Sequence, residues 1–145
     1  MRIPIVILVL LSGLLPVHAA ERLAGPVEAE VVRIVDGDTL VARARIWLGQ
    51  TVETHVRLAG VDAPELRGKC AVEKVRALAA REALARLVGD GPVTLSGIES
   101  DKFGGRVLAR VATGAHGDIA TALVEGGFVR AYAGGARSGW CGAEG

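Results

Sequence analysis

Residues 39–58, which read TLVARARIWLGQTVETHVRL, predict a β-hairpin. The second half has the two-residue period of a strand, because three charged or polar residues alternate with Val52, Thr54 and Val56. Gly49-Gln50 supplies the turn between the two halves. We therefore expect two antiparallel strands, residues 39–48 and 51–58.

The chain on either side of this hairpin predicts one more strand and a helix. Residues 27–35 are rich in β-branched side chains and end in the turn Asp36-Gly37-Asp38. Residues 59–69 are expected to be an ordered loop, since Pro64 disfavours helical backbone before it. Residues 71–88 have helical spacing, with a predicted buried face of Val72, Val75, Leu78, Ala79, Leu84, Leu87 and Val88.

The last third of the chain predicts two further strands, residues 93–100 and 106–113, and a short helix capped by Asp118. Three strands, a helix and two strands are typical of an OB-fold. We predict a mainly β fold of the α+β class, a five-stranded OB-fold β-barrel with two to three helices. The domain should span residues 27–133, followed by a C-terminal tail, residues 134–145.

Residues 1–20 have the pattern of a signal peptide. Arg2 precedes an uncharged apolar run, residues 3–11, and Pro16 leads into Ala19-Ala20, where we expect cleavage after Ala19. The run is too short to span a membrane, which takes about 20 residues. We expect an exported protein, periplasmic or secreted, that is monomeric and not stably associated with a membrane.

Cys70 and Cys141 are the two cysteines of the chain. In an oxidising compartment an even number of cysteines usually forms disulfides, so we expect this pair to tie the tail to the start of the helix. Two separate free thiols are the alternative.

The charge of the mature chain is balanced. Without Arg2, 16 of the 17 basic residues face 16 acidic ones. Passive, charge-driven binding to nucleic acid is therefore disfavoured, because such binding depends on an excess of Lys and Arg.

Carboxylates are close together in sequence at Asp36, Asp38, Asp62 and Glu65. In a hairpin, Asp38 and Asp62 should emerge at the same end of the barrel, where they could share a cation. Each motif alone is an ordinary turn or loop. Together the oxygen ligands favour Ca²⁺, whereas scattered histidines and paired cysteines disfavour zinc.

Two arginines could complete a phosphate site. Arg57 immediately precedes the acidic loop, and Arg106 follows a glycine pair at the start of a strand. A planar guanidinium can bind two phosphate oxygens at once. Without the acidic residues, either arginine would be read as a solvated strand residue.

Three motifs occur in order: VDGDT at residues 35–39, RLAGVDAPE at 57–65 and DKFGGR at 101–106. They resemble the signatures of the staphylococcal nuclease (thermonuclease-like) family. The resemblance implies an OB-fold, Ca²⁺-dependent endonuclease that cuts single-stranded or frayed DNA and RNA and leaves 3′-phosphate ends. It implies Ca²⁺ ligation by Asp38, Asp62 and the Ala63 carbonyl, phosphate binding by Arg57 and Arg106, and Glu65 as general base.

The chain departs from the family pattern in the third motif. Gly104-Gly105 replaces a single glycine, so Arg106 reaches the site only if the extra residue is absorbed as a bulge. If the extra residue is not absorbed, Arg110 is the candidate for the second phosphate-binding arginine. Phe103 stands where tyrosine is frequent, and Tyr132 either stacks on a base or packs in the core.

Some readings stay open at this point. Trp47 and Trp140 are expected in the core or against the tail. The rival to an enzyme is a catalytically weak or inactive OB-fold module that binds nucleic acid without cutting it, and a structural exported protein is the third possibility.

Overall fold

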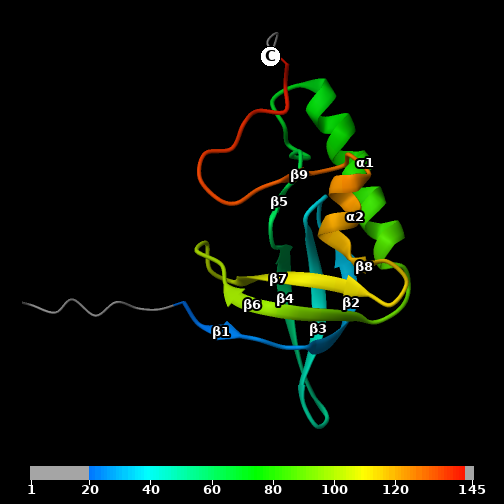
Figure 1. Ribbon diagram of the computed structural model, residues 1–145, viewed down its shortest axis with the longest axis vertical. Helices are drawn as coiled ribbons and strands as arrows, with labels where there is room; N and C mark the ends of the chain where they lie inside the picture. Colours follow the sequence, from blue (N-terminus) through cyan, green and yellow to red (C-terminus); the bar gives the residue numbers. More distant parts are fainter. Residues whose placement is uncertain (1–19, 143–145) are drawn as a thin grey trace, which may run out of the picture.

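The computed structural model describes residues 20–142 and contains a closed five-stranded barrel (Figure 1). Its strands are β2 (Val27–Ile34), β3 (Thr39–Trp47), β4 (Gln50–Leu58), β6 (Val93–Ser100) and β7 (Arg106–Thr113). They pair in the order β6-β2-β3-β4-β7, and β6 also pairs with β7, which closes the barrel. All these pairs are antiparallel except β4 with β7.

Shorter elements complete the described part of the chain. β1 (Arg22–Leu23) extends the edge of β6, and β8 (Gly117–Asp118) pairs with β7. β5 (Val61–Asp62) pairs with β9 (Arg130–Ala131). With the helices α1 (Ala71–Val88) and α2 (Ile119–Glu125), the predicted OB-fold is confirmed, with two helices in residues 20–142. The predicted signal peptide, apart from Ala20, lies outside the described residues.

The barrel core is formed by the inward-facing residues of the strands and one face of each helix. In the β3–β4 hairpin, Leu40 lies opposite Val56, and both are fully buried. Burying a side chain of this size contributes roughly 1.5–3 kcal/mol. Other fully or almost fully buried residues are Leu58, Leu84, Leu95, Val111, Ile119 and Leu123.

The predicted buried face of α1 was wrong over its first half. Val72, Val75 and Leu78 are 54 %, 67 % and 51 % exposed, whereas the buried apolar residues before Leu84 are small, Ala77, Ala80 and Ala83, and Glu73 is buried as well. The helix lies too close to the β2–β3 turn for larger side chains: a Cβ on Gly37 would lie 2.6 Å from the Cβ of Ala80. Alanines therefore make the interface, and larger apolar residues face outward.

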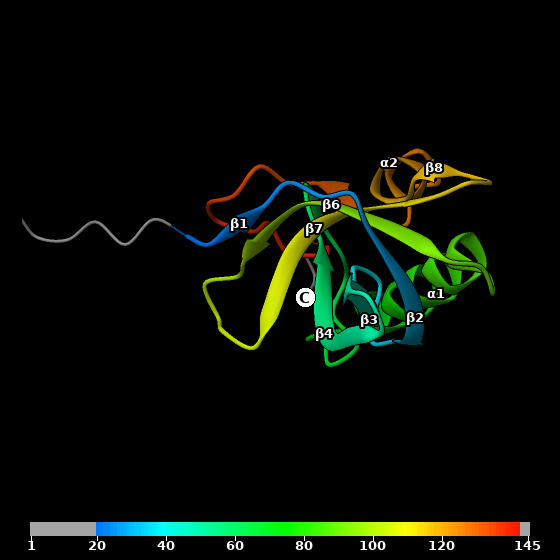
Figure 2. The same ribbon diagram turned by 90° about the horizontal axis from the view of Figure 1, so that it is seen from below.

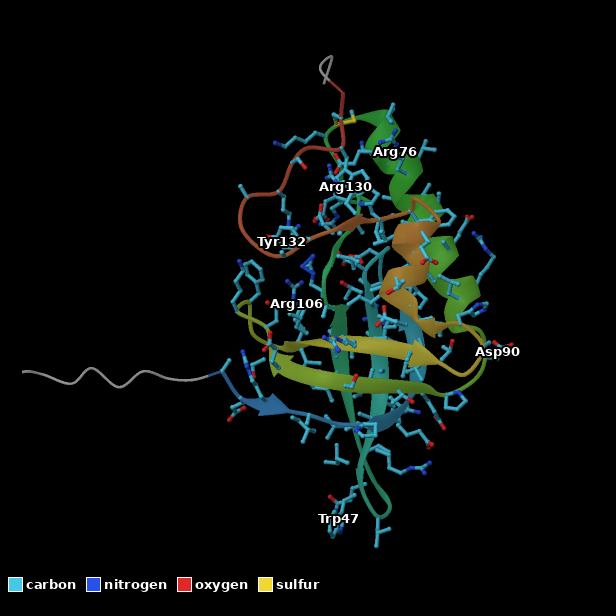
Figure 3. All side chains as sticks on the ribbon, in the orientation of Figure 1. Trp47, Arg76, Asp90, Arg106, Arg130 and Tyr132 are labelled. Atoms are coloured by element: carbon cyan, nitrogen blue, oxygen red, sulfur yellow. A yellow bond between two sulfur atoms is a disulfide. The ribbon has the colours of Figure 1, made fainter. Side chains whose placement is uncertain are left out.

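The expected packing of Trp47 was also wrong, because its side chain is 69 % exposed at the tip of the β3–β4 hairpin (Figure 3).

Both ribbon views place α1 and α2 on the same side of the barrel (Figures 1 and 2). Within residues 20–142, no helix combines the length and apolar character needed to cross a membrane.

The tail after β9 returns to the start of α1. A disulfide joins Cys70 to Cys141, with their Cα atoms 6.0 Å apart. Cys70 is also the N-cap of α1, so the tail is anchored beside the loop that leads into this helix. Residues far apart in sequence are thereby held at one end of the barrel.

Candidate active site

Asp38 lies buried in the turn between β2 and β3. Its backbone N–H donates to Asp36 Oδ1 at 3.1 Å, and its carbonyl accepts from the Leu58 N–H at 2.8 Å. The Thr39 hydroxyl donates to Asp38 Oδ1 at 2.9 Å. The turn thus places the carboxylate at the end of β4.

Arg57 pairs with this carboxylate from the neighbouring strand. Its Nη2 lies 3.0 Å from Asp38 Oδ2 and 3.3 Å from the Val61 carbonyl oxygen. The Ala63 N–H donates to the same Asp38 oxygen at 3.2 Å. Because Thr39 and Arg57 are directly opposed in the hairpin, the β-sheet register itself brings the first two sequence motifs together.

Burial raises the pKa of the Asp38 carboxyl to about 6 from an ordinary value of 3.8. Arg57 opposes this rise through its positive charge, whereas the Asp36 carboxylate adds to it. Burial thus disfavours the ionised form of Asp38, and a cation bound beside the carboxylate would favour that form.

We expect the metal-free protein to lose stability as pH rises from about 4 to about 7. The folded pKa of Asp38 lies above the unfolded one, so its contribution is fully present below pH 3.8 and is lost as pH passes about 6. Measured by urea unfolding in chelator, the free energy of unfolding should fall by roughly 1 to 3 kcal/mol more in wild type than in Asp38→Asn. Parallel pH profiles would contradict this prediction.

Asp62 is held by the C-terminal tail. The side chain is 6 % exposed, and its Oδ2 accepts from Trp140 Nε1 at 3.3 Å and from Arg130 Nη2 at 3.4 Å. Arg137 Nε lies 3.3 Å from Oδ1, which accepts no hydrogen bond. Arg130 also stacks on the Trp140 ring, 3.7 Å from its centroid.

Arg137 joins two of the predicted site residues. Besides Asp62, its guanidinium lies 3.2 Å from Glu65 Oε1. Burial would lower the pKa of Arg137, but Asp62, Tyr132 and Glu65 outweigh it and raise that pKa above its ordinary value, so the side chain is cationic. Sequence reasoning missed Arg130 and Arg137, since nothing local in the Gly-rich tail points to contacts about 70 residues away.

Glu65 is positioned through its backbone. Its N–H donates to Glu73 Oε1 at 3.2 Å, and the Lys69 N–H donates to Glu73 Oε2 at 3.0 Å. Glu73, buried in the first turn of α1, thus fixes the loop that carries Glu65. The Glu65 side chain is 60 % exposed and reaches the pocket.

Arg106 is brought to the same pocket. Gly104 and Gly105 have φ of +66° and +65° and lie in the turn that joins β6 to β7, whereas the register shift of the β6–β7 pair lies between Ser96 and Glu99. Arg106 begins β7, pairs with Asp101 and lies 5.0 Å from the centroid of the Phe103 ring. Arg110 is exposed farther along β7.

Four of the five predicted catalytic and carboxylate residues line one pocket of about 310 Å³: Asp38, Arg57, Glu65 and Arg106. Asp62 lies in an adjoining pocket of about 510 Å³. Phe103 and Tyr132 line a third, of about 450 Å³. Arg106 and Tyr132 lie on the same side of the barrel as the tail loop (Figure 3).

The arrangement agrees with a comparison to known protein families. The model of the family described as staphylococcal nuclease homologue matches residues 55–138, more than half of the chain. The chain belongs to this family. Its members are in general nucleases, and the family implies nucleic acid as the substrate. No curated protein matches the chain.

The matched segment contains Arg57, Asp62, Glu65 and Arg106 but begins after Asp38. Asp38 is connected to the family segment by its contacts with Arg57 and the Ala63 backbone. The structure thus places Asp38, which the first sequence motif had predicted, beside the matched segment.

Proposed function

We propose that this protein is an exported, Ca²⁺-dependent endonuclease that hydrolyses phosphodiester bonds of DNA, RNA or both to leave 3′-phosphate ends. The observation that carries the proposal is the pocket lined by three carboxylates and three guanidinium groups: Asp36, Asp38, Glu65, Arg57, Arg106 and Arg137. In such a pocket the carboxylates can bind a cation or act as a base, and the guanidinium groups can bind a phosphate group.

The residues present fit a hard cation. The proposed ligands, Asp38, Asp62 and the Ala63 carbonyl, offer oxygen atoms only, the donor type that Ca²⁺ prefers. Asp62 Oδ1 is buried and accepts no hydrogen bond, although Arg137 Nε lies 3.3 Å away, and burial raises the pKa of the Asp38 carboxyl; a bound cation would satisfy the first group and stabilise the ionised form of the second. Bound Ca²⁺ supplies charge neutralisation and polarisation of a phosphate oxygen.

The protein's own side chains perform the remaining steps. Arg57 and Arg106 donate hydrogen bonds to the non-bridging oxygens of the scissile phosphate, where negative charge grows during attack. Glu65 accepts a proton from the attacking water as the new P–O bond forms. The bond to the 5′-oxygen of the next nucleotide breaks, and the other product keeps the phosphate on its 3′-oxygen.

We further propose that the protein is exported and monomeric. The Cys70–Cys141 disulfide supports an oxidising compartment, periplasmic or extracellular, because such bonds rarely persist in the cytosol. Single-stranded or frayed nucleic acid is the proposed substrate.

Digestion of single-stranded DNA and RNA tests the proposal. We expect fragments in the presence of Ca²⁺ and none with chelator, and the fragments should prime a polymerase only after a phosphatase removes their 3′-phosphate. The Asp38→Ala/Asp62→Ala double variant is the control for adventitious nuclease. Binding without cutting would instead support an OB-fold binding module, and neither binding nor cutting would contradict both.

A further inference from the structure

Arg137, in the tail between β9 and the disulfide, pairs with two carboxylates at once. Its Nε lies 3.3 Å from Asp62 Oδ1, and its Nη1 donates to Glu65 Oε1 at 3.2 Å. Both carboxylates have roles in the proposed function, Asp62 as a ligand of the cation and Glu65 as the base. One guanidinium therefore contacts the group proposed to bind the cation and the group proposed to accept the proton.

The contact with Asp62 is electrostatic only. Oδ1 is buried and accepts no hydrogen bond, so the Arg137 contact lacks the geometry of a hydrogen bond. Such a contact balances charge but leaves the lone pairs of the oxygen unsatisfied. A carboxylate oxygen with free lone pairs is the kind of ligand that Ca²⁺ prefers. This oxygen is therefore better suited to a metal ion than to the guanidinium beside it.

The other arginine beside the same carboxylate is fixed in place. Arg130 lies 3.4 Å from the second oxygen, Oδ2, and stacks on the Trp140 ring. It also donates to the Ser138 carbonyl at 2.8 Å and to the Ser138 hydroxyl at 2.9 Å. Arg137 instead donates to Glu65, whose side chain is 60 % exposed, and its own side chain is 40 % exposed. Of the two arginines, Arg137 is the one that a cation can displace.

The tail can release the Arg137 side chain while its own anchors stay in place. Before the arginine, the Tyr132 N–H donates to the Gly60 carbonyl at 2.8 Å, and after it Cys141 forms the disulfide. Residues 133–139, between these anchors, are all exposed. The guanidinium can therefore turn away from Asp62 by side-chain rotation, and Arg137 also lines the catalytic pocket, into which the freed group can turn.

A cation at Asp62 Oδ1 and the Arg137 guanidinium exclude each other, because both are positively charged and would lie beside one buried oxygen. We propose that Arg137 is a built-in competitor of the cation. It pairs with Asp62 and Glu65 until a cation binds Asp62, and its departure frees Glu65 in the same step. This inference rests on the proposed function for the roles of the two carboxylates, and it names a residue that sets the affinity of the site for metal.

Calorimetric titration with Ca²⁺ tests the competition. Arg137→Ala should bind Ca²⁺ about tenfold more tightly than wild type, because a charged contact no longer has to be broken. Arg137→Met, which keeps the aliphatic stem, should show the same gain. Arg67→Ala is the matched control, because Arg67 is an exposed arginine that lines the same pocket as Asp62, and it should leave the affinity unchanged.

Guanidinium ion provides a second measurement. Millimolar guanidinium chloride should weaken Ca²⁺ binding to Arg137→Ala, because the small cation can enter the space that the side chain left. Sodium chloride at the same ionic strength should not have this effect, and wild type should respond alike to the two salts. A merely structural role of Arg137 would not produce a difference between the salts.

The competition is overturned if Arg137→Ala binds Ca²⁺ no more tightly than wild type, if Arg67→Ala shows an equal gain, or if the two salts act equally on Arg137→Ala. Digestion of single-stranded DNA separates this failure from failure of the proposed function. If wild type binds Ca²⁺ and cuts while Arg137→Ala gains no affinity, only the competition fails. If Arg137→Ala binds more tightly and wild type cuts nothing, only the nuclease assignment fails. Absence of Ca²⁺ binding in both proteins would overturn both.

Discussion

Glu65→Gln should reduce the rate constant of cleavage by about 10²- to 10⁴-fold at saturating Ca²⁺, the usual contribution of a general base. Glutamine keeps the shape of the side chain and its position in the pocket, but its amide cannot accept the proton of the attacking water. The backbone contact between the residue 65 N–H and Glu73 is retained, so the loop should keep its conformation. Single-turnover digestion of a single-stranded oligonucleotide gives the rate constant.

Two comparisons make the Glu65 result specific. The affinity for a non-hydrolysable oligonucleotide and the urea midpoint should change little, since the side chain is 60 % exposed. Glu82→Gln, on the exposed face of α1 beside Arg86, removes the same charge away from the pocket and should leave the rate unchanged. A Glu65→Gln enzyme as fast as wild type would exclude Glu65 as the base.

Arg57→Ala should impair both the fold and the reaction. The variant leaves the Asp38 carboxylate buried without its ion-pair partner, which costs about 3 to 5 kcal/mol for buried pairs. It also removes a donor to the phosphate, so cleavage by the remaining folded protein should slow by about 10²- to 10³-fold. Urea unfolding in chelator measures the first effect, and single-turnover digestion well below the midpoint measures the second.

Arg57→Lys separates these two roles. Lysine keeps the positive charge near Asp38 and should recover much of the stability, but it lacks the planar fork and should recover little of the rate. Arg43→Ala is the matched control, because Arg43 is an exposed arginine on β3 paired with Glu53 at 3.4 Å, and it should cost at most about 1 kcal/mol. Equal unfolding midpoints for Arg57→Ala and Arg43→Ala would contradict a stabilising role of the buried Arg57–Asp38 ion pair.

Much of the barrel could be predicted because strand alternation and turn residues are local signals. The hairpin of β3 and β4 follows from the alternation around Val52, Thr54 and Val56, and its register then places Thr39 opposite Arg57. The buried face of α1 could not be predicted the same way. Helical spacing identifies which residues share a face, whereas the close approach of Gly37 to Ala80 decides which face is covered.

The candidate site, like the fold, could be predicted from the sequence only in part. Asp38, Arg57, Glu65 and Arg106 belong to motifs that the chain carries in order, and the pocket joins them. Whether Arg106 reached the pocket depended on Gly104 and Gly105, whose positive φ values confine the extra residue to a turn. The backbone conformation at these two glycines decides where Arg106 lies, and residue spacing alone does not reveal that conformation.

The sequence by itself indicated the barrel through the order of its elements, and it determined the hairpin and the motifs that carry carboxylates and arginines, because strand alternation and turn residues are local signals. Only the tertiary structure decided the surroundings of Asp62, where Arg130, Arg137 and Trp140 lie around the carboxylate. The physical reason is distance along the chain: these contacts span about 70 residues, and they exist because β5 pairs with β9 and a disulfide returns the tail to α1.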